Sequence, residues 1–212
     1  MNVDGGSVDR ALALTYAPVD ARAGMKALFA LDATLAQIVR STREPLVGQM
    51  RLTWWHDALL TLGEGPSPAP PVLVDLAGHV LPRVPAIMLA SMIDGWEALL
   101  DDPLEEPAME TFARCRGGNL FEAAAVLLAV DGARARTAGE GWALADLAGH
   151  LRDPLAAARA RVLAEPKIAA ASCTPWPVRG RVLGALLLSA RPGEPGSPPR
   201  VGRMLWHRLT GR

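Results

Sequence analysis

Two charged side chains occupy positions where the apolar pattern of a helix favours a hydrophobic residue. Within residues 28–62, apolar residues recur at helical spacing in two stretches that are separated by Glu44 and Pro45. Asp32 falls inside the apolar arc of the first stretch, and Arg51 falls near the centre of the second arc. A buried charge costs several kcal/mol unless it is paired or serves a ligand. Asp32 and Arg51 are therefore expected to point inward, where they either pair and fix a helical hairpin or line a cavity between helices.

The composition limits the classes of partner and the cell compartment. The 212 residues include 22 basic and 22 acidic ones, so the formal net charge is zero and no basic surface for nucleic acid is expected. The most apolar runs, 123–130 and 182–190, are shorter than the roughly 20 residues that cross a bilayer. Cys115 and Cys173 lack a metal-binding or redox spacing. A cytoplasmic protein without a signal peptide, at most peripheral at a membrane, is expected.

Helical periodicity predicts an all-α fold in a single domain over residues 1–212. Ala and Leu recur at helical spacing almost throughout, whereas the alternation typical of strands is rare. Gly- and Pro-rich residues 63–71 and 191–199 are predicted to be flexible loops. Gly117 and Gly118 predict a kink or a close backbone approach inside a helix. The helices are expected at about 7–16, 19–42, 45–63, 72–80, 84–100, 109–130, 137–151, 154–162 and 178–189, with a last short helix that ends near 209.

The predicted hairpin resembles the squalene/phytoene synthase family. LFALDATLAQIV and the following EPLVGQMRLTWWHDAL carry the resemblance, which is closest to the proteobacterial and mitochondrial branch of synthase-like proteins. Weaker similarities continue to about residue 166. The resemblance implies a shortened helical bundle of the isoprenoid synthase type. Enzymes of this family join two isoprenyl diphosphates head to head, using two Asp-rich helical motifs that hold Mg²⁺ against the diphosphate.

The chain departs from the family at both Asp-rich motifs. Asp32 matches the first acid of the first motif, but Ala36 stands one turn later. Asp153 matches the first acid of the second motif, but Ala157 stands one turn later. The resemblance thus leaves one carboxylate on each side, which is too few for the usual cluster of metal ions. No cofactor is expected, and Mg²⁺ is implied only if the chain is an active transferase.

Two arginines remain as candidates for phosphate recognition, and no catalytic residue is assigned. Arg51 and Trp55 belong to the family's Arg-Leu-x-Trp-Trp block, and Arg161 stands where the family has a basic residue before an apolar-to-Pro turn. The candidate substrate-binding residues are Asp32, Arg51, Trp55, Asp153 and Arg161. For Arg161, a solvated face is the commoner explanation, because Arg is usually exposed and two further arginines stand nearby, at 152 and 159.

Two functions are compatible with this pattern. The favoured one is a degenerate synthase-like protein without Mg²⁺-dependent prenyl condensation. It would bind a prenyl diphosphate or another apolar lipid, or act as an assembly module with respiratory-complex assembly proteins, as members of the mitochondrial branch do for complex I. The alternative is an active farnesyl or geranylgeranyl diphosphate transferase in squalene, hopanoid or carotenoid biosynthesis. The favoured location is the cytoplasm, with a peripheral position at the inner membrane as the second choice.

Overall fold

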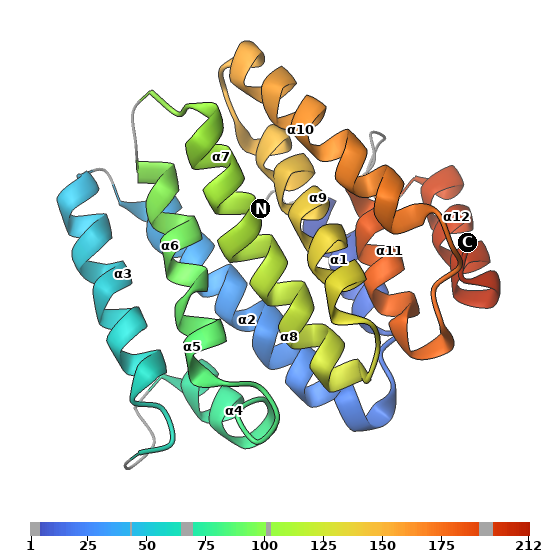
Figure 1. The fold of residues 1–212 in the computed structure, drawn as a ribbon, viewed down its shortest axis with the longest axis horizontal. Coiled ribbons are helices and arrows are strands. Elements are labelled where there is room, and N and C mark those ends of the chain that lie inside the picture. Colours follow the sequence, from blue (N-terminus) through green and yellow to red (C-terminus); the bar gives the residue numbers. More distant parts are fainter. Residues whose placement is uncertain (1–4, 43, 65–69, 101–102, 191–196) are drawn as a thin grey trace.

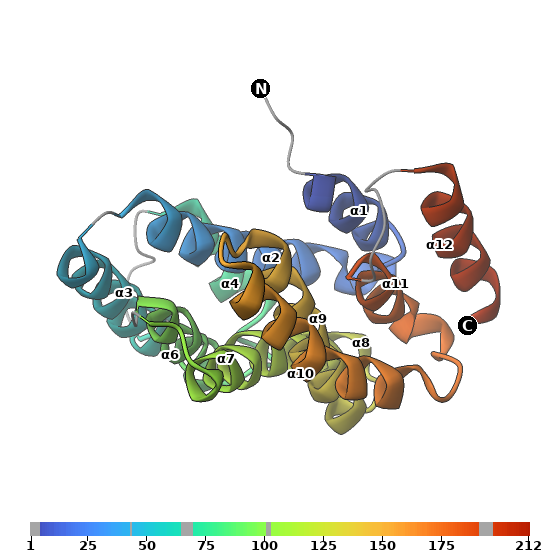
Figure 2. The same ribbon diagram turned by 90° about the horizontal axis from the view of Figure 1, so that it is seen from above.

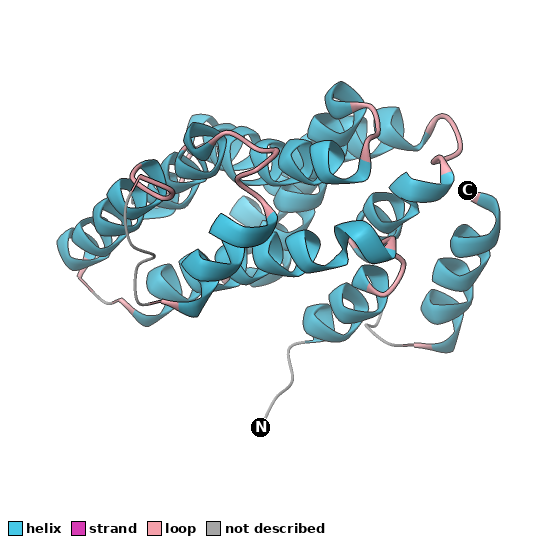
Figure 3. Cartoon of the chain, turned by 90° about the horizontal axis from the view of Figure 1, so that it is seen from below, coloured by secondary structure: helices cyan, strands magenta, loops and turns pink. Residues whose placement is uncertain are grey.

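The computed structural model describes residues 5–42, 44–64, 70–100, 103–190 and 197–212. In these residues, helices make up all the regular structure (Figure 3). The predicted all-α class is confirmed. The elements are α1 (Gly5–Leu14), α2 (Val19–Ser41), α3 (Pro45–Leu60), α4 (Pro71–His79), α5 (Ala86–Ala90), α6 (Met92–Glu97), η1 (Ala98–Leu100), α7 (Glu106–Phe112), the π-helical η2 (Ala113–Gly118), α8 (Asn119–Leu128), α9 (Gly132–His150), α10 (Pro154–Ser172), η3 (Val178–Gly180), α11 (Arg181–Ser189) and α12 (Pro198–Thr210).

Helix α2 runs behind α8 in the view of Figure 1 and contacts α1, α3, α4, α6 and α8. Helix α3 lies at one end of the molecule and α12 at the other, as the view from above also shows (Figure 2). The buried hydrophobic residues form one cluster that extends from Ala13 to Met204. That cluster agrees with the single-domain organisation, which stays a prediction. None of the described helices is long and apolar enough to cross a membrane.

Helix α2 follows the predicted pattern closely. Its 23 residues contain no Pro. Pro18 precedes the helix, and its ring restricts φ, here −53°, at the point where the helix begins. The apolar arc that includes Met25, Leu28 and Leu35 is fully buried. The helix ends because Thr42 adopts an extended conformation. Asp32 shares this buried face, so its predicted inward position is confirmed.

The glycine pair produces the predicted close backbone approach. A Cβ atom at Gly117 would collide with the carbonyl oxygen of Gly139 on α9, and a Cβ at Gly139 would collide with that of Gly117. The chain between α7 and α8 widens into the π-helical η2, which ends at Gly118. Such π segments are rare and are frequently found at functional sites. Here η2 brings the residue before the pair, Arg116, against α9.

Several predicted boundaries are wrong for identifiable reasons. The helix expected over 84–100 is divided into α5, α6 and η1, with a break at Ser91, whose hydroxyl donates to the carbonyl of Ile87 at 2.9 Å. Helix α10 continues past Pro166 to Ser172, although an internal Pro costs about 3 kcal/mol. Helix α10 packs along α9, and Ala164, two residues before Pro166, is buried in that contact region. Helix α1 begins at Gly5, before the predicted cap Ser7.

Each of the two predicted loops ends earlier than expected. Residues 65–69 of the first and 191–196 of the second lie outside the described residues. Pro71 already begins α4, and Pro198 begins α12, because Pro suits the first turn of a helix.

Candidate functional site

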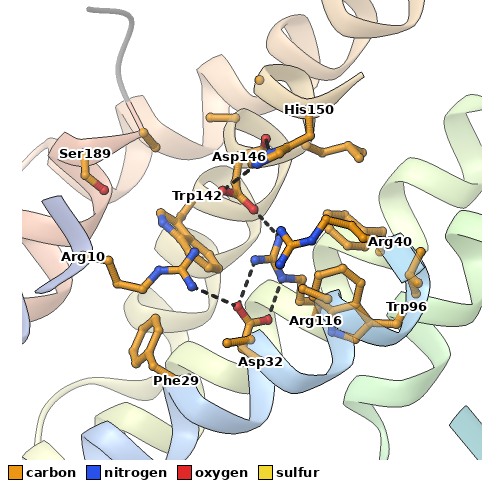
Figure 4. A pocket seen from close by; sticks show the side chains of 18 of the residues that line it. Arg10, Phe29, Asp32, Arg40, Trp96, Arg116, Trp142, Asp146, His150 and Ser189 are labelled. Carbon is orange, nitrogen blue, oxygen red and sulfur yellow. Dashed lines mark hydrogen bonds and ion pairs between the residues drawn. The ribbon is translucent and has the colours of Figure 1, made fainter. Parts of the chain in front are cut away.

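A cavity of about 830 Å³ opens between α1, α2, α6, α7, α9 and α11 (Figure 4). Its wall is mainly apolar and includes the aromatic side chains of Phe29, Trp96, Phe112 and Trp142. Apolar pockets with a few convergent polar groups are the usual form of a small-molecule site. At the centre of this cavity, Asp32, Arg116 and Asp146 form one polar cluster.

Arg116 lies at the centre of the cluster and binds two carboxylates. Its Nε donates to Oδ1 of Asp32 at 2.7 Å, and its Nη2 donates to Oδ2 of the same carboxylate at 2.9 Å. Its Nη1 donates to Oδ2 of Asp146 at 2.7 Å. Asp32 comes from α2 and Asp146 from α9, so the guanidinium joins both sides of the cavity (Figure 4). The bidentate pairing is the geometry in which Arg binds a carboxylate most strongly.

Three aromatic rings enclose the same guanidinium. The Cζ atom of Arg116 lies 4.5 Å from the ring centroid of Trp96, 4.6 Å from that of Trp142 and 5.1 Å from that of Phe112. These distances are within the range of a cation–π interaction. Arg116 is only 2% exposed and Asp32 is fully buried. The rings and the carboxylates together replace the water that a charge of this kind needs.

The charges of the cluster stabilise one another. Burial lowers the pKa of the Arg116 guanidinium, but the carboxylates of Asp32 and Asp146 raise it by more, so Arg116 stays cationic. Burial raises the pKa of the Asp146 carboxyl, but Arg116, His150 and Arg10 lower it by more, and the pKa lies below its ordinary value. Asp146 is therefore an anion at neutral pH, and so neutralises part of the charge of Arg116.

Further cations surround the cavity. Arg10 on α1 lies with Nη1 3.8 Å from Oδ2 of Asp32, and its Cζ is 5.5 Å from the ring of Trp142. Lys26 and Arg40, both exposed, line the cavity from opposite ends of the α2 segment. They are 14 residues apart, which corresponds to about 21 Å along a helix. Neither forms a hydrogen bond or an ion pair within the described ranges, so both are available to an anionic ligand.

The residues present do not fit the magnesium cluster that the fold implies. Both oxygens of Asp32 and one oxygen of Asp146 accept hydrogen bonds from Arg116. A divalent ion between them would meet the guanidinium charge and would have to displace these bonds. Within the described part of the chain, no three His, Cys, Asp or Glu side chains are close enough to hold a metal ion. The hydrogen bonds of Arg116 therefore already use three of the four carboxylate oxygens of Asp32 and Asp146.

Arg51 and Trp55 lie away from the cavity. The prediction that Arg51 points inward is wrong, because its side chain is exposed and Nη1 donates to Oγ of Ser41 at 3.2 Å and to Oγ1 of Thr42 at 3.1 Å. The apolar arc of α3 misled the prediction, because Trp54 on this arc is also exposed. Trp55 is half-buried and packs against the core, but it does not line the cavity.

The two candidates from α10 are also outside the cavity. Asp153 caps the start of α10, where Oδ1 accepts from the backbone N–H of Leu155 at 3.0 Å and Oδ2 from that of Ala156 at 3.2 Å. This is the ordinary role of Asp before a helix that begins with Pro. Arg161 is exposed on α10, as the solvated-face alternative predicted. Of the five candidates, only Asp32 is part of the cluster.

Sequence reasoning missed Arg116 and Asp146. A signal existed for each, because Arg116 stands one turn after Phe112 and Asp146 stands one turn after Trp142, and both aromatic residues are buried. The spacing indicates that the charged residues share the aromatic face of their helices. It does not indicate which of the many acids and bases meet.

Comparison with known proteins supports the relationship that the hairpin motifs suggested. The family model described as squalene/phytoene synthase matches residues 3–163, which is about three quarters of the chain. No curated protein and no solved structure matches the chain closely enough to add a relative. The matched region contains α2, η2 and α9, from which the buried cluster is built. The chain therefore belongs to the squalene/phytoene synthase family.

Proposed function

We propose that the protein is a member of its family that has lost Mg²⁺-dependent prenyl condensation and keeps the cavity as a binding site for a long apolar ligand. The observation that carries this proposal is the position of Arg116 between Asp32 and Asp146. Head-to-head condensation begins with departure of a diphosphate, which needs cations to neutralise the developing charge. In this site the guanidinium is already neutralised by two carboxylates, so it has little charge left for a leaving group.

The cavity itself suits an amphiphile with an isoprenoid-type chain. Its lining is mostly apolar, and the part of α2 that lines it, from Lys26 to Arg40, rises about 21 Å along the helix axis. At its margins, Arg10, Lys26 and Arg40 supply positive charge for an anionic head group without a metal ion. The Nε1 of Trp96, a lining residue, is buried and has no hydrogen-bond partner among the described residues. A buried donor without a partner favours a ligand that carries an acceptor.

The relationship within the family is part of the same proposal. We place the chain near the proteobacterial and mitochondrial branch of synthase-like proteins, in which an assembly role for respiratory complexes accompanies loss of condensation. The protein would then act in the cytoplasm or at the surface of the inner membrane. Deletion of the gene that encodes this protein should lower respiratory NADH oxidation and leave isoprenoid pools unchanged. Loss of squalene or phytoene with normal respiration would instead support the transferase alternative.

A direct assay tests the loss of condensation. Purified protein with Mg²⁺ and farnesyl or geranylgeranyl diphosphate should form no squalene or phytoene above the level of a heat-inactivated sample. Product formation that disappears in Asp32→Ala would overturn the proposal.

Binding in the presence of a chelator tests the retained cavity. Calorimetry with farnesyl diphosphate should detect binding, and Ala33→Trp should weaken it, because the indole would occupy part of the cavity that Ala33 lines. Ala23→Trp is the matched control, because Ala23 lies on the same helix α2 and is exposed but does not line the cavity. Equal binding by Ala33→Trp and the parent protein would place the ligand elsewhere.

A charge-removing variant tests recognition of the head group. Arg10→Gln should weaken binding of the diphosphate by roughly tenfold, since hydrogen bonds to charged groups contribute about 1.5–3 kcal/mol. The same substitution should hardly change binding of uncharged farnesol. Equal losses for both ligands would assign Arg10 a structural role instead.

A further inference from the structure

The last helix, α12, has one face that packs on the protein and an opposite face that is apolar and exposed. Its inner face carries the buried side chains of Met204 and His207 and packs against α11. Its outer face carries Leu205, Trp206 and Leu209, whose exposed fractions are 46%, 63% and 73%. At 100° per residue these three side chains span an arc of about 100°, centred opposite the buried face. Helix α12 lies at the end of the molecule, so the described helices leave this outer arc uncovered (Figure 2).

Arginines flank the outer arc on both sides. On the helical wheel, Arg208 lies about 60° beyond Leu205, and Arg203 lies about 60° beyond Trp206. Both arginines are exposed. Residues 198–212 contain four Arg and no Asp or Glu, although the whole chain has a net charge of zero. Of these four, Arg203 and Arg208 border the uncovered face, whereas Arg200 is buried on the inner face beside Asp9.

The outer face has a fixed orientation, because the inner face is held by several polar contacts. The Nε of Arg200 lies 2.9 Å from Oδ2 of Asp9 on α1. Nε2 of His207 lies 3.1 Å from the carbonyl oxygen of Arg181. At the end of the helix, the carbonyl of Gly211 accepts a hydrogen bond at 2.8 Å from the backbone N–H of residue 176. Gly211 has a φ of 77°, which a residue with a side chain rarely adopts.

We propose that the outer face of α12, formed by Leu205, Trp206 and Leu209 with Arg203 and Arg208, docks on an anionic membrane surface. A helix with an apolar face that contains Trp and Leu, bordered by Arg, lies in the plane of a lipid interface. The rings of Trp favour the head-group level, and flanking arginines reach anionic lipids. The two flanking arginines favour a membrane over a partner protein with an apolar groove. Anionic lipids would supply counter-charges to both arginines, whereas an apolar groove would not. This proposal needs no ligand in the cavity, and it deepens the membrane-surface location given under the proposed function by assigning the face that docks.

Vesicle sedimentation tests the docking surface. The full chain should sediment with vesicles of equal parts phosphatidylcholine and phosphatidylglycerol, and much less with vesicles of phosphatidylcholine alone. Binding should fall as salt is added. Leu209→Glu should weaken binding about tenfold or more, because burial of a Leu side chain is lost. Arg203→Gln should weaken binding about fivefold, the effect of one basic residue near an anionic surface.

Leu155→Glu is the matched control. Leu155 on α10 is 71% exposed, close to the 73% of Leu209, and the two substitutions add the same charge to different surfaces. Leu155→Glu should bind vesicles as the parent protein does. Equal binding by Leu209→Glu and the parent, or failure of the parent to bind anionic vesicles, would overturn the proposal. So would a dimer in sedimentation analysis that Leu209→Glu converts to a monomer, because α12 would then contact a second copy of the chain.

Discussion

Replacement of Arg116 by Met should destabilise the protein strongly, while leaving a side chain of similar length among the aromatic rings. Arg116 makes three hydrogen bonds to carboxylates, at 2.7, 2.7 and 2.9 Å, and is 2% exposed. Without it, the fully buried Asp32 loses both of its strong donors. Removal of one partner from a buried ion pair typically costs about 3–5 kcal/mol. Since a domain is stable by about 5–15 kcal/mol, the variant should fold but unfold at a clearly lower urea concentration.

A double-mutant cycle separates the pair interaction from general packing effects. Asp32→Asn, Arg116→Met and the double variant should be compared by urea unfolding, followed by far-ultraviolet circular dichroism. Because Asp32→Asn removes the buried charge that Arg116→Met leaves unpaired, the double variant should be more stable than the sum of single effects predicts. The expected coupling is about 2 kcal/mol or more. If Arg116→Met does not fold, Arg116→Lys replaces it in the cycle, since Lys keeps the charge but lacks the bidentate fork.

An exposed pair of the same type supplies the control. Arg179 donates to both carboxylate oxygens of Asp20, through Nη1 at 3.3 Å and Nη2 at 2.6 Å, and both side chains are largely exposed. Asp20→Asn should therefore change stability far less than Asp32→Asn, because water already solvates the exposed pair. A coupling below about 0.5 kcal/mol between Asp32 and Arg116 would refute the reasoning, since sites that do not interact are additive within this error.

Two further predictions concern backbone packing and pH. Gly117→Ala should destabilise the protein by several kcal/mol in chemical unfolding, because its Cβ would collide with Gly139. Gly149→Ala on α9 should be neutral or stabilising by up to about 1 kcal/mol, because no atom lies within 4 Å of the added Cβ; equal effects of the two would contradict the close approach. Burial lowers the pKa of His207 below its ordinary value and outweighs the hydrogen bonds with the backbones of Arg181 and Arg212, which raise it. Folding thus favours the neutral ring, so its contribution is complete above about pH 6.5 and is lost as the pH falls through the lowered pKa. His207→Gln should flatten the pH dependence of thermal unfolding in this range, and an unchanged slope would assign it to other groups.

The amino-acid sequence by itself determined the helical class, the position of α2 and the family. These features depend on the spacing of Ala and Leu and on a contiguous motif, which are local properties of the chain. The buried position of Asp32 was also predictable, because the apolar residues around it define one face of a single helix. The close approach at Gly117 was predictable in kind, although its partner on α9 was not.

Only the tertiary structure decided which charges meet. Arg51 and Arg116 both stand in apolar helical patterns, but α3 lies at the edge of the molecule and leaves Arg51 in solvent, whereas η2 presses Arg116 into the core. The partner of Asp32 is 84 residues away in the chain, so neither helical period nor motif spacing contains that contact. For the same reason the second carboxylate of the cluster is Asp146, whereas Asp153, which matches the family motif, caps a helix. Helical periodicity fixes the face of each side chain, but the packing of α2, η2 and α9 around the glycine contact fixes which faces come together.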